Sequence, residues 1–247
     1  MHQYLSVIIV FFLCCMASTP AFAFNQKDVD KLIKTKRCQG CDFSGANLAY
    51  ADLGKAYFPK SNLEGANLED ANLSEADFRE SNFQKANLKH ANMYGAKMFK
   101  SNFAFADLSD SNLGKASFTK ASLIYSNLSR ANLADAYSRE ADLSNSNLSG
   151  ANLYKVSLEK AILKKANLKK ANLRKAYLQG ADMQGAKLQG ADLTFAKMEK
   201  SKLQNAVFEE TILDHAFVYQ AEFDETGRAY ALKHGARFAR DDRIDGE

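Results

Sequence analysis

Cys38 and Cys41 are the residues whose type and spacing most directly suggest chemistry. They form a Cys-x-x-Cys pair directly after Lys36 and Arg37. Such a pair acts as a thiol redox couple when its first cysteine begins a helix after a strand. It supplies two zinc ligands when a second cysteine pair or two histidines lie nearby. Neither a second pair nor a histidine pair is close in the sequence, so we favour a disulfide or two small buried thiols and keep the redox and zinc sites as alternatives.

No catalytic motif accompanies this pair. The sequence has no G-x-S-x-G nucleophile elbow and no G-x-x-x-x-G-K phosphate loop, and His90 and His215 are isolated. The net charge of +4 in 247 residues is too small to indicate nucleic acid or an anionic membrane as the partner. We therefore expect no enzymatic activity, no catalytic residues, no cofactor and no metal site.

A repeat of five residues predicts the structure that positions Cys38 and Cys41. A large residue, here called i, recurs at every fifth position from Phe43 to Phe223, giving 37 units without an insertion. Ser138 is the single polar residue at i. Position i−2 is mostly Ala or Ser, and position i−1 is mostly Asn or Asp. Repetition on this scale outweighs any local secondary-structure pattern.

A period of five excludes an α-helix as the main element, because a residue repeated every fifth position drifts around the helix axis. In an extended chain, residues i−2 and i point to one side and residue i−1 to the other. Positions i+1 and i+2 must then turn a corner, and several glycines fall at i+2, where a positive φ costs glycine little. A chain that turns every five residues with one side inward winds into a solenoid.

The units ANLED, ANLSE, ADLSN and ANLKK resemble the A(D/N)Lxx consensus of the pentapeptide repeat family. The resemblance covers residues 41 to 223. It implies an all-β fold, a right-handed quadrilateral parallel β-helix with four units per coil and with i and i−2 inside. Thirty-seven units then give about nine coils, and about 4.8 Å per coil gives a rod about 45 Å long.

The phenylalanines at i support a turn of 20 residues. Between residues 43 and 123 they fall on two adjacent sides of such a square, while the other two sides hold Leu and Met. One side carries Phe43, Phe83 and Phe103, and the adjacent side carries Phe58, Phe78 and Phe118.

Both ends of the solenoid need covering, because an open coil presents unpaired backbone groups. Before the first coil, Asn25 is a candidate N-cap, and Val29, Leu32 and Ile33 follow at helical spacing. After the last coil we expect a short helix near 225 to 234 and fraying after about 239. The side chains available to cover that coil are Tyr230, Leu232 and Phe238.

The chain divides into four expected segments. Residues 1–23 read as a secretory signal peptide, with an apolar run from Leu5 to Ala17 and a small-x-small cleavage pattern ending at Ala23. An uncleaved anchor is the alternative. Residues 24–40 form the N-terminal cap, residues 41–225 the repeat β-helix, and residues 226–247 the C-terminal cap and a polar tail. We expect no membrane association after cleavage, and a secreted or periplasmic location, or the thylakoid lumen for a photosynthetic source.

The outer surface carries the candidate binding residues. We call one group the acidic band: Glu64, Glu69, Asp70, Glu75 and Glu80. We call a second group the basic band: Lys155, Lys160, Lys164, Lys165, Lys169, Lys170, Arg174 and Lys175. The two lie roughly 20 Å apart along the expected rod. Phe105 and Tyr125 are 20 residues apart and should stack at one corner, with Phe99 nearby.

The favoured function is a noncatalytic extracytoplasmic scaffold or protein-interaction rod. Its expected partner is another protein or an anionic envelope polymer, with self-association through the acidic band as a further option. The resemblance offers an alternative, because some family members mimic B-DNA and bind DNA gyrase. Such a topoisomerase regulator needs a mostly acidic rod, whereas this chain is net basic and we expect no nucleic acid partner. A redox protein using Cys38 and Cys41 is the third hypothesis.

Overall fold

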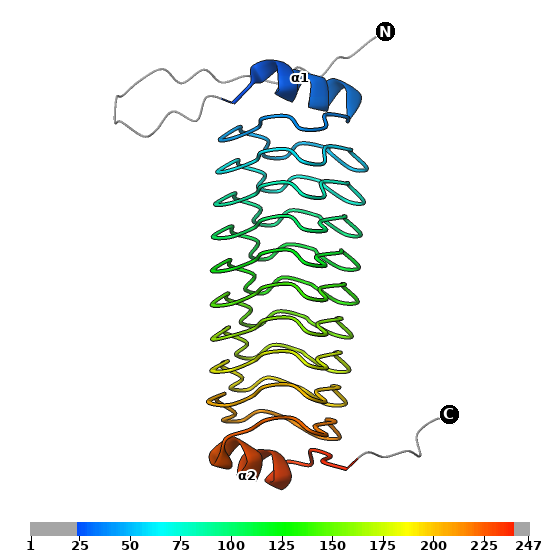
Figure 1. Ribbon diagram of the computed structural model, residues 1–247. Helices are drawn as coiled ribbons and strands as arrows, with labels where there is room; N and C mark the ends of the chain where they lie inside the picture. Colours follow the sequence, from blue (N-terminus) through cyan, green and yellow to red (C-terminus); the bar gives the residue numbers. More distant parts are fainter. Residues whose placement is uncertain (1–23, 240–247) are drawn as a thin grey trace, which may run out of the picture.

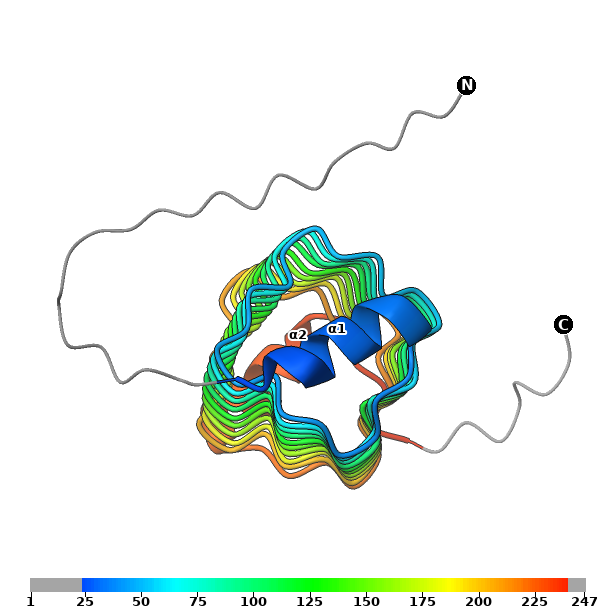
Figure 2. The same cartoon turned by 90° about the horizontal axis from the view of Figure 1, so that it is seen from above.

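The computed structural model of the protein describes residues 24–239. The predicted signal peptide, 1–23, and the polar tail beyond residue 239 lie outside the described residues. Between the two helices the chain forms a stack of similar turns (Figure 1), and viewed along the stack these turns have a four-sided outline (Figure 2).

Parallel β-bridges join residues that are 20 positions apart. They run from Arg37↔Tyr57 to Phe217↔Arg237, and each involves an i−1 residue or its equivalent at the ends. One turn therefore contains four five-residue units. Each side of a turn contributes a single bridge residue, so the described part of the chain forms a parallel β-helix from isolated bridges and not from longer strands.

The corners have the positive φ expected for the glycines at i+2, and residues of other types share it. Every i+2 residue from 45 to 220 has a positive φ, and the non-glycine residues among them have values of 54 to 61°. Backbone hydrogen bonds hold this conformation: Lys165 N donates to Gln184 O at 2.9 Å, and Ala166 N donates to Leu163 O at 3.1 Å. These hydrogen bonds recur along the rod and offset the cost of a positive φ for residues that have a Cβ. Lysine can therefore occupy the i+2 position, as glycine does.

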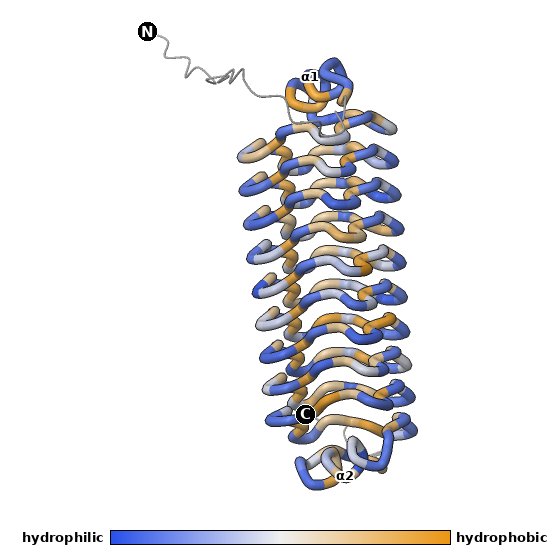
Figure 3. The backbone as a smooth tube through the Cα atoms, turned by 90° about the vertical axis from the view of Figure 1, so that its left-hand side faces the viewer, coloured by the Kyte–Doolittle hydropathy of each residue, from blue (hydrophilic) through white to orange (hydrophobic). Residues whose placement is uncertain are grey.

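The core lies inside the turns. The large residues at i and the small residues at i−2 are buried along the rod, and Figure 3 shows hydrophobic residues recurring at the same place in successive turns. Phe58 stacks on Phe78 with ring centroids 5.3 Å apart, and Phe83 stacks on Phe103 at 4.8 Å. These pairs confirm the expected turn of 20 residues.

The buried serines at the i−2 position have hydrogen-bond partners. Ser61 and Ser101 occupy the i−2 position on one side of the rod and are buried. The Ser61 hydroxyl donates to Cys38 O at 3.0 Å, and the Ser101 hydroxyl donates to Phe78 O at 2.9 Å. These bonds offset the cost of burying hydroxyl groups in an otherwise apolar core.

An asparagine ladder runs along the outside of the turns. Asn147 shows the pattern: its Nδ2 donates to Asn127 Oδ1 at 3.2 Å. Its Oδ1 accepts from Asn167 Nδ2 at 2.9 Å and from the Ser149 backbone N–H at 3.2 Å. Each ladder residue therefore caps its own corner and joins two coils. Three sides of the rod carry such asparagines, and the side that begins with Arg37 and Tyr57 does not.

A helix lies at each end of the stack. The first, α1, spans Gln26–Thr35, and the Asn25 side chain caps it by accepting a hydrogen bond from Lys27 N at 3.1 Å. Leu32 is buried and Val29 packs against the core. Ile33, which was expected to pack inward, is 50% exposed. Adjacent residues of an α-helix are rotated by about 100° around its axis, so Ile33 lies off the face on which Leu32 packs.

The second helix, α2, spans Glu225–Lys233 and is capped by Asp224. Tyr230 covers the last coil, because its ring stacks on Phe208 with centroids 5.8 Å apart. Leu232 is 58% exposed, contrary to expectation, and Ala231 takes the buried position instead. Neither helix is long and apolar enough to cross a membrane, among the residues that the structure describes.

Candidate functional site

The basic band lies on the corners of the rod. All eight of its side chains are exposed, and five of them, at 155, 160, 165, 170 and 175, occupy the i+2 position with positive φ. Two members form ion pairs with carboxylates of the following coil. Lys164 Nζ lies 3.2 Å from Asp182 Oδ2, and Arg174 Nη1 lies 3.2 Å from Asp192 Oδ2. The other six form no ion pair with a described carboxylate, so their charge is available to a partner.

Glycines of the following coil make room for the lysine stems. The position of a Cβ on Gly185 would be 3.4 Å from Lys165 Cγ, and on Gly190 it would be 3.4 Å from Lys170 Cγ. The aliphatic stems therefore extend along the corners over bare backbone, while the ammonium groups remain in solvent. This packing positions the lysines without neutralising them.

The acidic band differs from the basic band, because lysines of neighbouring coils partly neutralise its charge. Lys85 Nζ lies 3.4 Å from Glu64 Oε1, Lys55 Nζ lies 3.9 Å from Glu75 Oε2, and Lys60 Nζ lies 4.0 Å from Glu80 Oε2. Such exposed pairs contribute little to stability. They do reduce the negative potential of the acidic band, which weakens the case for docking between two copies of the chain.

The three candidate aromatic residues lie at two separate places on the rod. Phe105 and Tyr125 stack at one corner, with ring centroids 5.2 Å apart and an interplanar angle of 6°. More than half of each side chain is exposed. Phe99 belongs to the preceding unit, where Lys100 Nζ lies 5.2 Å from its ring centroid. The three therefore do not form one continuous aromatic surface.

Cys38 and Cys41 are joined by a disulfide in the structure, with Cα atoms 5.7 Å apart. Both are buried beneath α1, and Asp28 of that helix accepts a hydrogen bond from Asp42 N at 3.0 Å. A carboxylate oxygen of Asp28 lies within 4.8 Å of both sulfur atoms. Joined sulfurs offer no thiolate, so this cluster does not supply the four ligands of a structural zinc site.

The shifted pKa values belong to ion pairs and caps on separate parts of the rod. Arg130 donates two hydrogen bonds to Asp110, at 2.7 and 2.6 Å, and holds the pKa of Asp110 below its usual value. A hydrogen bond from Lys36 lowers the pKa of Asp52. Burial raises the pKa of Tyr230 in α2. These groups stabilise structure locally and do not meet in one cleft.

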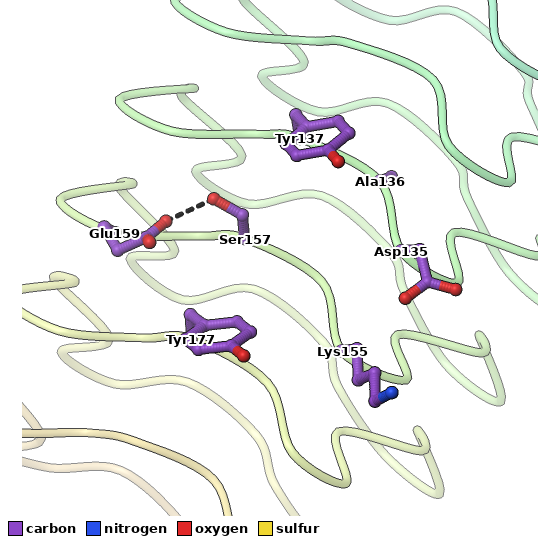
Figure 4. A pocket seen from close by; sticks show the side chains of 7 residues that line it. All are labelled: Asp135, Ala136, Tyr137, Lys155, Ser157, Glu159 and Tyr177. Carbon is purple, nitrogen blue, oxygen red and sulfur yellow. Dashed lines mark hydrogen bonds between the residues drawn. The ribbon is translucent and has the colours of Figure 1, made fainter.

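One surface feature was missed at the level of sequence. On the side of the rod without the asparagine ladder, the bridge residues include Tyr57, Tyr137, Tyr177 and Phe217. These aromatic residues are separated by 40 or 80 positions. A search of the i−1 positions at twice the turn length would have found them. Tyr137 and Tyr177 line a shallow cleft, with Ser157 between them and Glu159 at one edge (Figure 4).

The repeats match the profile of a known protein family. The profile of the family described as Pentapeptide repeats matches in eight copies, over residues 37–65, 61–98, 101–137, 126–164, 166–205 and 191–226. These ranges cover most of the chain. No curated relative matches the sequence.

The chain is similar to two solved structures, and of these two the first has a TM-score above 0.5 and supports a shared fold. A trypsin-treated form of QnrB1, described as a plasmid-mediated fluoroquinolone resistance protein, is 20% identical with a TM-score of 0.58, over 80% of this chain and 94% of that chain. At this identity the likeness concerns the fold alone. HetL, a pentapeptide repeat protein involved in heterocyst differentiation regulation in the cyanobacterium Nostoc sp. strain PCC 7120, is 26% identical over 79% of this chain and 97% of that chain. Its TM-score is 0.49.

Proposed function

The chain belongs to the pentapeptide repeat family, and we propose that it is a noncatalytic interaction rod that docks an anionic partner on its basic band. Proteins of this family form right-handed β-helices and are generally noncatalytic. For this chain, about nine coils follow from 37 units in turns of four.

The observation that carries the proposal is the unbalanced charge of the basic band. Residues 155–175 contain eight cations and one anion, Glu159. Only Lys164 and Arg174 have carboxylate partners among the described residues. Cations fixed on a rigid rod attract an anionic surface with little loss of conformational freedom, and complementary charge raises the rate and the specificity of association.

The partner is another protein with an acidic surface or an anionic envelope polymer, encountered outside the cytoplasm. The predicted signal peptide supports this location, which is the periplasm or the exterior, or the thylakoid lumen if the source is photosynthetic. Self-association is a weaker proposal, because lysines of adjacent coils already pair with Glu64, Glu75 and Glu80.

Two alternatives have less support. A DNA-mimicking regulator of a topoisomerase needs an acidic rod, and the basic band works against that mimicry; a gyrase supercoiling assay tests it. A redox role needs an accessible disulfide. Cys38 is 1% exposed and Cys41 is 8% exposed, so a partner thiol could not reach them without displacing α1. Insulin reduction by wild type and a Cys38→Ala variant tests that role.

Affinity capture tests the proposed docking. The mature protein is immobilised, exposed to an envelope extract, and compared with a variant carrying Glu at 164, 165, 169 and 170. A matched control reverses four exposed lysines elsewhere on the rod, Lys97, Lys100, Lys187 and Lys200, and so has the same net charge. We expect the band variant alone to lose the captured partner. Equal capture by all three proteins would show that the basic band is not the docking surface.

A further inference from the structure

The side of the rod without asparagines holds a slot between two tyrosine rings. Tyr137, Ser157 and Tyr177 are consecutive bridge residues on this side, one in each of three successive coils. Coils repeat every ~4.8 Å, so the two tyrosines are about 10 Å apart. Ser157 is too small to fill the space between them. Figure 4 shows the two rings in similar orientations on either side of Ser157.

Both rings present surface to this slot. Tyr137 is 58% exposed and Tyr177 is 37% exposed. Lys197, from the coil after Tyr177, places Nζ 5.4 Å from the centroid of the Tyr177 ring. This contact covers the ring on the side away from Ser157 and helps to hold its orientation. The ring face toward Ser157 is left for a ligand.

Polar groups line both edges of the slot. The Ser157 hydroxyl donates a hydrogen bond to Glu159 Oε2, which fixes the carboxylate beside the gap. Asp135 and Lys155 line the opposite edge from one corner of the rod. The slot therefore offers hydrogen-bond acceptors on both edges and a donor on one, between two apolar ring faces.

We propose that this slot binds one pyranose ring of a glycan. A saturated six-membered ring midway between the tyrosines would place its carbons about 4–5 Å from both aromatic faces, the contact distance of apolar heavy atoms. Its hydroxyls point outward around the ring, where Glu159 and Asp135 accept hydrogen bonds and Lys155 donates one. A flat aromatic ligand is a poorer fit, because two stacking distances of about 3.5 Å do not span the gap.

An organic cation is the main competing occupant. A cation at the centre would lie about 5 Å from both rings, within the range of cation–π attraction. Lys155 at the edge opposes this, and the surrounding corners carry further lysines of the basic band, such as Lys160 and Lys175. A neutral ring with hydroxyl groups suits the mixed charges better.

Ligand-observed saturation-transfer NMR on the mature protein tests the slot. The probes are cellobiose and maltose, which are neutral glucose disaccharides, and tetramethylammonium as the competing cation. We expect saturation transfer to a disaccharide, and affinity about fivefold to tenfold weaker in Tyr137→Ala and in Tyr177→Ala. Tyr137→Phe should bind nearly as wild type, because it keeps the stacking face. Glu159→Gln should weaken binding less than either alanine variant.

Tyr57→Ala is the matched control, since it removes an aromatic residue of the same side four coils from Tyr137. Thermal melts establish that each variant is folded. Binding of neither disaccharide, equal binding by Tyr137→Ala and wild type, or binding of tetramethylammonium alone would overturn the proposal. The slot variants leave the lysines of the basic band intact, so this test is independent of the proposed docking function.

Discussion

Replacing Asn147 with alanine tests how much the asparagine ladder contributes to stability. The substitution removes three hydrogen bonds, to Asn127 Oδ1, from Asn167 Nδ2 and from the Ser149 N–H, at 3.2, 2.9 and 3.2 Å. A net contribution of about 0.5–1 kcal/mol for each partly solvated bond gives a loss of about 2 kcal/mol. In a domain of this size, that loss lowers the Tm by about 4–8 °C.

Asn147→Asp separates the two roles of the side chain. A carboxylate still accepts from Ser149 N and Asn167 Nδ2, but it cannot donate to Asn127 Oδ1. We expect the free energy of unfolding to fall by about half as much as in the alanine variant. Lys97→Ala is the control, because Lys97 is an exposed bridge residue on the side without the ladder, and such surface changes alter stability by about 0.5 kcal/mol or less.

Differential scanning calorimetry of the purified mature protein provides the measurement, with reversibility checked by a second scan. The expected order of Tm is wild type and Lys97→Ala, then Asn147→Asp, then Asn147→Ala. If Asn147→Ala melts within 1 °C of Lys97→Ala, water replaces the ladder bonds fully and the ladder does not hold coils together.

Three further predictions concern single features of the rod. Because Arg130 lowers the pKa of Asp110, the pair adds stability above the unfolded pKa of the carboxyl, and this is lost as pH falls through the lower folded value. Asp110→Asn should therefore lower the Tm at pH 7, and its difference from wild type should shrink as the pH falls through the folded pKa of Asp110; a difference that does not change with pH would refute the pairing. Ser138→Leu restores the repeat in the buried core and should raise stability by about 1–2 kcal/mol; a lower Tm would mean that the site has collapsed around serine. Reducing the Cys38–Cys41 disulfide, which closes a very short loop, should cost only about 2 kcal/mol, so a reductant should lower the Tm by a few degrees and not unfold the rod.

The sequence was sufficient to predict the turn and the core. Regular spacing from Phe43 to Phe223 assigned the inward residues, and Phe58 does stack on Phe78 one turn later. Asn25 was identified as the cap of α1 from its type and position. These features depend on local periodicity and on short-range hydrogen bonds, which a single sequence records directly.

Features that depend on contacts between coils were harder to predict. Ile33 and Leu232 fit an apolar helical pattern, yet each points to solvent, because the rotation of a short helix over a coil depends on the whole packed surface. The acidic band was predicted from its own residues alone, whereas Lys55 and Lys60, which lie 20 positions earlier in the sequence than Glu75 and Glu80, partly neutralise it. The tyrosine slot was missed because Tyr137 and Tyr177 are separated by two turns.

The central claim is that the basic band, and not the net charge of the protein, recruits an anionic partner. Its most direct test is binding to poly-L-glutamate, a defined anionic polymer, at low and at high salt. Wild type and the control with Glu at 97, 100, 187 and 200 should bind at low salt and release at high salt, while the variant with Glu at 164, 165, 169 and 170 should bind far more weakly than either at low salt. Equal binding by the two charge-matched variants would contradict the account.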